Sequence, residues 1–257
     1  MMDFKNLLET AKSAALVAGE KILEVYNSDD FNVEAKKDDS PLTKADRLAH
    51  EAITEALKST NLPILSEEGR DIAYDERKSW EYFWMVDPLD GTKEFIKRNG
   101  EFTVNIALIH EGRSILGVVY APVLNRCFLA YKGGGATVEE GGWSKPVEVK
   151  QFSLADEGLK VVASRSHLND DTKNFMSDLN QPEIVSMGSS LKFMVVAEGG
   201  AHLYPRFAPT MEWDTAAAQI VVEEAGGEVL QQETNTPVVY NKENLLNPYF
   251  LCRGNAG

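Results

Sequence analysis

The sequence has 257 residues and a formal net charge of −14 at pH 7, from 40 acidic and 26 basic side chains. This length fits one large domain or two closely fused halves, and a hydrophobic content of 43% is typical of a globular chain and excludes disorder. An acidic chain repels nucleic-acid backbones and anionic lipids, so we expect no nucleic-acid polymer among its partners. A small anionic substrate is still compatible with this charge if bound metal ions reverse it locally.

Cysteine content and hydropathy both indicate a cytoplasmic protein. Cys127 and Cys252 have no metal-site spacing and are too few for a disulfide framework, which favours a reducing compartment. We expect no transmembrane segment, because no apolar run is long enough to span a bilayer, and the first residues lack a signal-peptide core. Peripheral contact with the inner face of the membrane is left open, as is the choice between a monomer and a homodimer.

The first elements in chain order are two helices. Apolar residues at helical spacing predict an amphipathic helix over residues 4–25 and a second helix over residues 43–57. Asp46 follows Thr43 as in a capping box, with Asp in place of Glu. The charged residues 29–40 between the two helices predict a loop or a weak hairpin.

Five short apolar runs follow the helices and predict strands. They cover residues 63–65, 82–86, 102–109, 115–120 and 126–131. The third and fourth runs flank a turn that contains Gly112, which is typical of an antiparallel hairpin. The first half, residues 1–151, is therefore expected to place two helices on an antiparallel sheet.

Residues 152–257 alternate between predicted strands and helices, which favours an α/β layer. The predicted strands cover residues 160–163, 183–186 and 201–204. The predicted helices cover residues 171–179, 190–198 and 213–225, and the last ends at two glycines. We therefore expect an α/β fold, a layered α+β sandwich built from two halves, residues 1–151 and 152–257.

The segment 87–92, Asp-Pro-Leu-Asp-Gly-Thr, carries the densest chemical signal. A hydrophobic strand delivers Asp87 to its end, and the tight turn that follows lets Asp90 point into the same space. Two carboxylates with a backbone carbonyl between them are hard oxygen ligands, which Mg²⁺ prefers, and the amides after Gly91 suit a phosphate. Each dipeptide alone is more often a simple turn, but the combination favours a metal site.

Three further acids are candidate site residues, and each has a structural alternative. Glu67 follows the predicted strand 63–65, where acids often form only a solvated turn. Asp214 lies in the first turn of an apolar predicted helix, where it would also favour the helix dipole. Asp46 lies at the start of the predicted helix 43–57, where helix capping is the alternative.

Together these four elements resemble the inositol-monophosphatase superfamily of metal-dependent, lithium-sensitive phosphatases, over most of the chain from Ser40 to Gly227. The segment 87–92 and the later Trp-Asp-Thr-Ala-Ala at 213–217 are its most specific motifs. The resemblance implies the αβαβα architecture of inositol monophosphatases and sugar phosphatases. Asp-Gly-Thr-Lys-Glu-Phe at 90–95 is closer to the 3'(2'),5'-bisphosphate nucleotidases of the CysQ type, because inositol monophosphatases typically have Asp-Gly-Thr-Thr-Asn-Phe there.

The resemblance implies two or three Mg²⁺ ions per active site. Glu67, Asp87 and the Leu89 carbonyl would hold the first ion. Asp87, Asp90 and Asp214 would hold the second, and Glu67 would also reach a third, weaker ion. Two such ions neutralise a phosphate dianion and acidify the attacking water.

The resemblance also assigns residues to the attacking water and to the substrate phosphate. Asp46 and Thr92 would orient and activate the water, together with the metal ligand Glu67. The backbone amides of Gly91 and Thr92 would bind the scissile phosphate. The residues expected to border the substrate at this point are Leu89, Asp90, Gly91, Thr92 and Asp214.

On the nucleotide side, the resemblance implicates Ser189, Lys192 and Arg206, which would contact the nucleotide or its second phosphate. His167 lies where the nucleotidases have a nucleotide-contacting histidine, and an ordinary surface histidine is the alternative.

The reaction implied is Mg²⁺-dependent hydrolysis of the 3'-phosphate of adenosine 3',5'-bisphosphate to AMP and phosphate. Conversion of 3'-phosphoadenylyl sulfate to adenylyl sulfate is a second candidate. One alternative keeps the metal site but acts on inositol phosphate or fructose 1,6-bisphosphate. An alternative from another class is an inactive nucleotide- or metal-binding protein.

Overall fold

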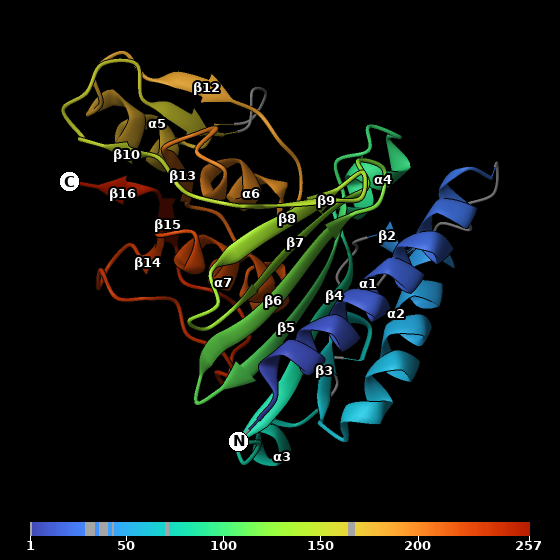
Figure 1. The fold of residues 1–257 in the computed structure, drawn as a ribbon. Helices are drawn as coiled ribbons and strands as arrows, with labels where there is room; N and C mark the ends of the chain where they lie inside the picture. Colours follow the sequence, from blue (N-terminus) through green and yellow to red (C-terminus); the bar gives the residue numbers. More distant parts are fainter. Residues whose placement is uncertain (1, 29–33, 36–40, 43, 70–71, 164–167) are drawn as a thin grey trace.

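The computed structural model has five layers in which helices and sheets alternate (Figure 1). Two long helices form one outer layer, followed by a seven-stranded sheet, two inner helices, a five-stranded sheet and an outer helix. This order is the αβαβα architecture expected from the sequence. The structure describes residues 2–28, 34–35, 41–42, 44–69, 72–163 and 168–257.

The paired outer helices are α1 (Phe4–Tyr26) and α2 (Lys44–Leu57), close to the predicted positions. α1 packs tightly on the sheet because its inward residues are small, and a Cβ added at Gly19 would lie 2.3 Å from the Tyr120 ring. Thr43, which begins the predicted capping box, lies outside the described residues. Within the described ranges, no helix is long and apolar enough to cross a membrane. The cytoplasmic location stays a prediction.

The larger sheet has the strand order β3-β4-β5-β6-β7-β8-β9. Its strands are β3 (Ile64–Ser66), β4 (Tyr82–Asp90), β5 (Thr103–His110), β6 (Arg113–Ala121), β7 (Arg126–Tyr131), β8 (Ala136–Glu140) and β9 (Trp143–Pro146). β3 and β4 are parallel, and the other neighbours are antiparallel. The predicted hairpin is confirmed, and its turn residues Glu111 and Gly112 adopt φ angles of 49° and 73°. The sequence analysis did not predict β8 and β9.

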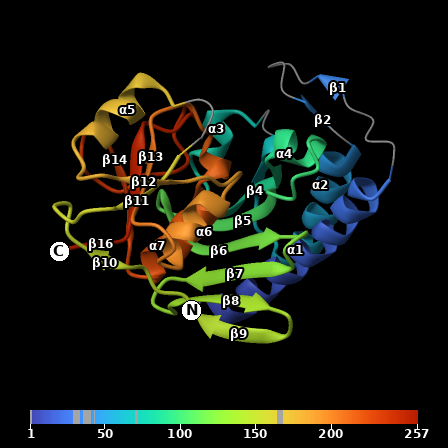
Figure 2. The same ribbon diagram turned by 90° about the horizontal axis from the view of Figure 1, so that it is seen from above.

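The smaller sheet has the order β12-β11-β13-β15-β14 and is parallel in its first three strands. Its strands are β11 (Lys160–Val162), β12 (Glu183–Val185), β13 (Leu203–Arg206), β14 (Glu228–Gln231) and β15 (Phe250–Arg253). The inner helices α6 (Leu191–Ala197) and α7 (Ala216–Glu224) lie between the two sheets, and α5 (Asp170–Ser177) covers the outer face (Figure 2). The sequence analysis did not predict β14 and β15.

Several shorter elements connect these layers. β1 (Glu34–Ala35) pairs with β2 (Pro41–Leu42) in the region where a loop or weak hairpin was expected. β10 (Gln151–Phe152) pairs in parallel with β16 (Asn255–Ala256). The remaining turns and short helices are η1 (Lys58–Thr60), η2 (Glu67–Gly69), α3 (Tyr74–Arg77), α4 (Thr92–Ile96) and η3 (Glu212–Asp214).

β4 is buried on both faces, which explains its continuous apolar sequence. Trp84 and Val86 pack in the core under α1 and α2. Phe83 and Met85 pack on the opposite face, in the core that contains α6 and α7. Because side chains alternate along a strand, Asp87 follows Phe83 and Met85 on the face toward the inner helices.

The inner core joins the two predicted halves. One cluster of buried side chains includes Met85 from β4, Phe193 from α6 and Phe250 from β15. α6 and α7 therefore bury apolar surface against both sheets. The boundary between residues 151 and 152 stays a prediction.

Candidate active site

A β-bulge brings Asp87 and Asp90 onto one face of the larger sheet. Residues three apart on a regular strand point to opposite faces. Here Asp87 pairs with Asn105 and Asp90 with Thr103, so β4 contains one residue more than β5 between these pairs. Both acids therefore follow one side-chain row, which faces the inner helices. The sequence predicted that the strand ends at Asp87, but the ladder continues to Asp90 because the bulge absorbs the extra residue.

Glu67 and Asp214 reach this sheet edge from two other elements. Glu67 directly follows β3, which pairs in parallel with β4 and ends level with Val86. Asp214 ends η3, and Thr215, with a φ of −120°, separates it from α7. The one helix predicted over 213–225 is therefore two elements, because the backbone at Thr215 leaves the helical conformation.

The charges of two other acids act on the buried Asp214 carboxylate. Burial and the Asp90 carboxylate raise the pKa of Asp214 to about 8, and the Glu67 carboxylate also raises it. The Met211 backbone N–H opposes this shift by donating to Asp214 Oδ2 at 2.9 Å. A divalent cation would relieve the repulsion among the carboxylates, and carboxylate oxygens are ligands that hard cations accept. In the described part of the chain, no three acidic, histidine or cysteine side chains converge closely enough to form a complete metal cluster.

Hydroxyl and amide groups from β5 and from the segment before α6 surround the Asp90 carboxylate. Ser189 Oγ lies 2.7 Å from Asp90 Oδ2, and the Ser190 backbone N lies 2.6 Å from the same oxygen. Asn105 Nδ2 donates to Ser190 Oγ at 2.9 Å, and Thr103 Oγ1 lies 2.6 Å from Ser189 Oγ. These contacts fix the orientation of Asp90 before any ligand binds.

Thr103, Asn105 and Ser190 belong to the site although no sequence motif pointed to them. A signal for the first two does exist in β5. Ala107 and Ile109 of this strand point into the apolar core. Thr103 and Asn105 alternate onto the same face, and buried polar residues there interrupt an otherwise apolar pattern.

Close backbone packing surrounds Gly91, which follows β4. Gly91 has a φ of 94°, and an added Cβ would lie 3.1 Å from Ser189 Cβ and 3.2 Å from the Glu101 carbonyl oxygen. Ser189 itself adopts a φ of 52°, which is uncommon for a residue with a side chain. The turn after Asp90 and the segment before α6 therefore approach each other through a glycine.

The pair predicted to act on water comes from two helices, with Thr92 at the start of α4 and Asp46 on α2. Thr92 Oγ1 lies 3.5 Å from Asp46 Oδ1 and 3.4 Å from the Leu89 carbonyl oxygen, both long for hydrogen bonds. Asp46 lies on α2 and is only 1% exposed. The tertiary structure thus joins residues that are 46 positions apart in the sequence.

Three of the predicted nucleotide-side residues border the same pocket as Asp90 and Asp214. A pocket of about 70 Å³ is lined by Asp90, Ser189, Lys192, Arg206 and Asp214, among others. An adjoining hollow of about 90 Å³ also contacts Lys192 and Arg206. Burial lowers the pKa of Lys192, while the nearby Asp90 raises it. His167 lies outside the described residues.

A larger hollow of about 350 Å³ lies away from these acids, between α1 and the strands β6 to β9. Trp143 borders it, together with Glu139 and Glu140. Both carboxylates already have cationic partners, at 2.8 Å from Lys12 and 3.0 Å from Arg126. We place the chemistry at the smaller pocket, because there the acids repel one another and cations adjoin them.

Asp90 and Asp214 share a pocket with Lys192 and Arg206 inside an αβαβα sandwich. This combination of fold and site is typical of phosphatases with an αβαβα fold.

Comparisons with known proteins agree with this class. The sequence profile of the "Inositol monophosphatase family" matches residues 3–249. The chain is 47% identical over 247 residues to the 3'(2'),5'-bisphosphate nucleotidase CysQ of Salmonella typhimurium, covering 95% of this chain and 98% of that protein. The crystal structure of CysQ from Bacteroides thetaiotaomicron has a TM-score of 0.87 and 45% identity, covering 99% of both chains. An inositol monophosphatase from Anabaena has a TM-score of 0.74 and 25% identity, covering 99% of this chain and 92% of its own. The chain belongs to the inositol monophosphatase family and is a phosphatase.

Proposed function

We propose that this phosphatase hydrolyses the 3'-phosphate of adenosine 3',5'-bisphosphate to give AMP and phosphate. The observation that carries the proposal is the pocket in which Lys192 and Arg206 adjoin Asp90 and Asp214. A substrate with two phosphates fits this arrangement, because one phosphate can meet the metal-binding acids while the cationic side chains receive the other. The names of the relatives at 45–47% identity support the same substrate class.

We assign to these acids the two or three Mg²⁺ ions that the family implies. Glu67, Asp87 and the Leu89 carbonyl would hold one ion, and Asp87, Asp90 and Asp214 a second, with Glu67 also reaching a third. Bound Mg²⁺ supplies positive charge that neutralises the phosphate and makes a nearby water more acidic.

The chain's own groups would orient the water and the phosphate. Asp46 Oδ1, 3.5 Å from Thr92 Oγ1, accepts a hydrogen bond from the Thr92 hydroxyl. Thr92 Oγ1 would in turn accept a hydrogen bond from the attacking water and so orient it. The backbone amides of Gly91 and Thr92, at the start of α4, would bind the scissile phosphate.

The nucleotide side would use Ser189, Lys192 and Arg206, with His167 as a further contact. Lys192 Nζ already donates to the Ser189 carbonyl oxygen at 3.1 Å, which holds the ammonium at the pocket wall. A 3'-phosphoadenylyl sulfate substrate would present a sulfated 5'-phosphate to the same cations, so we include it as a second substrate.

Phosphate release from adenosine 3',5'-bisphosphate, inositol 1-phosphate and fructose 1,6-bisphosphate, each with and without Mg²⁺, tests the proposal. We expect Mg²⁺-dependent release mainly from the nucleotide. Release mainly from the inositol or sugar phosphate would overturn the nucleotide assignment and keep the metal site. Specific binding of the nucleotide with no release from any substrate would identify an inactive binding protein.

A further inference from the structure

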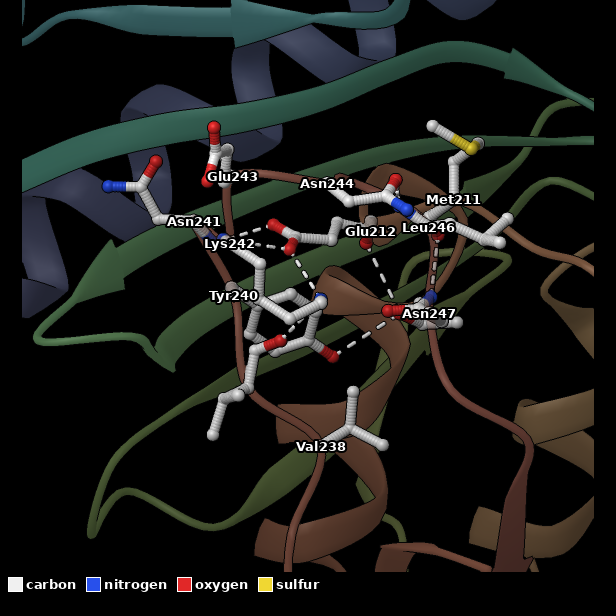
Figure 3. A network of polar contacts seen from close by, with 12 residues as sticks. Met211, Glu212, Val238, Tyr240, Asn241, Lys242, Glu243, Asn244, Leu246 and Asn247 are labelled. Carbon is white, nitrogen blue, oxygen red and sulfur yellow. Dashed lines mark hydrogen bonds and ion pairs between the residues drawn. The ribbon is translucent and has the colours of Figure 1, made fainter. Parts of the chain in front are cut away.

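The turn that carries Asp214 rests on a segment near the end of the chain, residues 240–247 (Figure 3). The Glu212 backbone N–H donates to the Leu245 carbonyl oxygen at 2.9 Å. Asn247 Nδ2 donates to the Met211 carbonyl oxygen at 2.7 Å and to Thr215 Oγ1 at 3.0 Å. The segment therefore contacts η3 on both sides of Asp214.

Glu212 makes the strongest of these contacts. Its side chain is fully buried, and Oε2 accepts the Asn241 backbone N–H at 2.6 Å. Oε1 accepts the Lys242 backbone N–H at 3.1 Å and the Lys242 ammonium at 2.5 Å. A buried carboxylate with a cationic partner and two amide donors cannot shift without leaving charges unpaired, which is strongly unfavourable.

Arg77 holds the other side of the same segment and is itself only 2% exposed. Its Nη1 donates to Asn241 Oδ1 at 2.8 Å and to the Lys242 carbonyl oxygen at 2.7 Å. Its Nη2 donates to the Glu243 carbonyl oxygen at 2.9 Å. Arg77 ends α3, which lies in the connection between η2 and β4. Residues 241–243 thus link α3 to the turn that carries Asp214.

We propose that Glu212 is a positioning residue, which holds the turn of Asp214 in place through residues 241–243 and thereby strengthens metal binding. The proposal rests on the proposed function, because it takes Asp214 as a metal ligand. A ligand that is already held in place loses less conformational entropy when the ion binds, so its affinity is higher. Lys242, through the contact with Glu212, has the same role to a smaller extent.

Direct titration of Mn²⁺ into the purified protein, followed by calorimetry and without substrate, tests this role. Mn²⁺ is the probe because it takes the same oxygen ligands as Mg²⁺. We expect Glu212→Gln to weaken Mn²⁺ binding about tenfold, since Gln keeps the size but loses the charge that holds Lys242. Turnover at saturating metal should stay within about threefold of the wild type, because no acid of the site is removed.

Glu198→Gln is the matched control. It breaks the partly buried Arg126–Glu198 ion pair at the far end of α6, where the side chains are 20% and 23% exposed. We expect this variant to keep the wild-type Mn²⁺ affinity even if its melting temperature falls. A lower melting temperature of Glu212→Gln with unchanged Mn²⁺ affinity would overturn the positioning role.

Lys242→Met keeps the test decisive if Glu212→Gln does not fold. The Lys242 side chain is 28% exposed, and Glu212 would still accept two backbone amides. We expect about threefold weaker Mn²⁺ binding in this variant. Unchanged binding would reject the inference alone, whereas a wild-type protein that binds no Mn²⁺ would overturn the proposed metal-dependent function with it.

Discussion

Ser190 holds Asp90 through two groups at once, since its backbone N and its Oγ lie 2.6 Å and 2.8 Å from Asp90 Oδ2. The same Oγ lies 2.8 Å from the Asp214 backbone carbonyl oxygen. Ser190 immediately precedes α6, whereas Asp90 ends β4 in the larger sheet. One residue at the layer boundary therefore contacts two segments that each carry an acid of the candidate site.

Ser190→Ala should weaken both the fold and the site. The variant keeps the backbone donor but loses a hydroxyl that contacts a buried carboxylate, so we expect the free energy of unfolding to fall by about 1–2 kcal/mol. Loss of the Asp90 orientation should lower turnover about tenfold. Urea unfolding and phosphate release measure the two effects. Ser177→Ala, which removes an exposed contact to the Asn174 carbonyl oxygen, serves as the control. Wild-type turnover in Ser190→Ala would contradict the prediction.

Asp90→Asn should abolish most of the activity while the fold persists. The amide keeps the shape of the side chain but removes a negative charge that Mg²⁺ needs, so we expect turnover to fall at least about 100-fold. The melting temperature should stay within a few degrees of the wild type, as for the exposed control Asp178→Asn. Near-normal phosphate release would reject Asp90 as a metal ligand.

Gly91→Ala should destabilise the protein more than the same substitution at Gly158, which has a similar backbone angle. The added methyl would meet Ser189 at 3.1 Å and the Glu101 carbonyl at 3.2 Å, on top of the strain of a φ of 94°. Gly158 has a φ of 73° and no atom within 4 Å of an added Cβ, so Gly158→Ala measures backbone strain alone. We expect the excess loss to be about 1–2 kcal/mol by urea unfolding, with lower turnover. Equal losses would show that Ser189 simply moves aside.

The stability of the metal-free protein should depend on pH through Asp214. Burial and Asp90 raise its pKa to about 8, above the ordinary value of 3.8, so the folded state binds this proton more tightly than the unfolded chain. That contribution is complete below the unfolded pKa and is lost as pH rises towards about 8. Mg²⁺ must displace the proton, so its stabilising effect should grow over the same interval.

Melting temperatures with EDTA and with MgCl₂, taken between about pH 6 and about pH 9, measure this effect. The gap between the two curves should widen with pH and then level off. Asp214→Asn should remove the widening, because its amide carries no titrating proton. A constant gap in the wild type would show that Asp214 is already ionised near neutral pH.

Arg206→Gln should change substrate preference more than catalysis. Arg206 lines the pocket beside the acids, so losing its charge should raise KM for adenosine 3',5'-bisphosphate about tenfold or more. Turnover of 3'-AMP, which lacks the second phosphate, should change less than about threefold. Lys173→Gln removes an exposed cation that pairs with Asp170 and is the charge-matched control. Equal losses on both substrates would place Arg206 at the scissile phosphate instead.

The sequence by itself determined the elements whose apolar pattern is regular. α1, α2 and the β5–β6 hairpin follow from periodicity and a two-residue turn, because their side chains pack along one face or both. The positions of the acids after strands also follow from the sequence, as does the αβαβα resemblance. The sequence does not predict four strands, β8, β9, β14 and β15. They are short or mix polar with apolar residues, so they form only because they pair with neighbouring strands.

Only the tertiary structure decided how the acids meet. The bulge that turns Asp87 and Asp90 to the same face depends on pairing with β5, since the local sequence also suits an ordinary turn. The contacts of Ser190 and of Glu212 join residues 100 and about 30 positions apart, and no local pattern records them. Local propensity fixes which backbone conformations are favourable, whereas burial and hydrogen bonding between layers fix which side chains share one pocket.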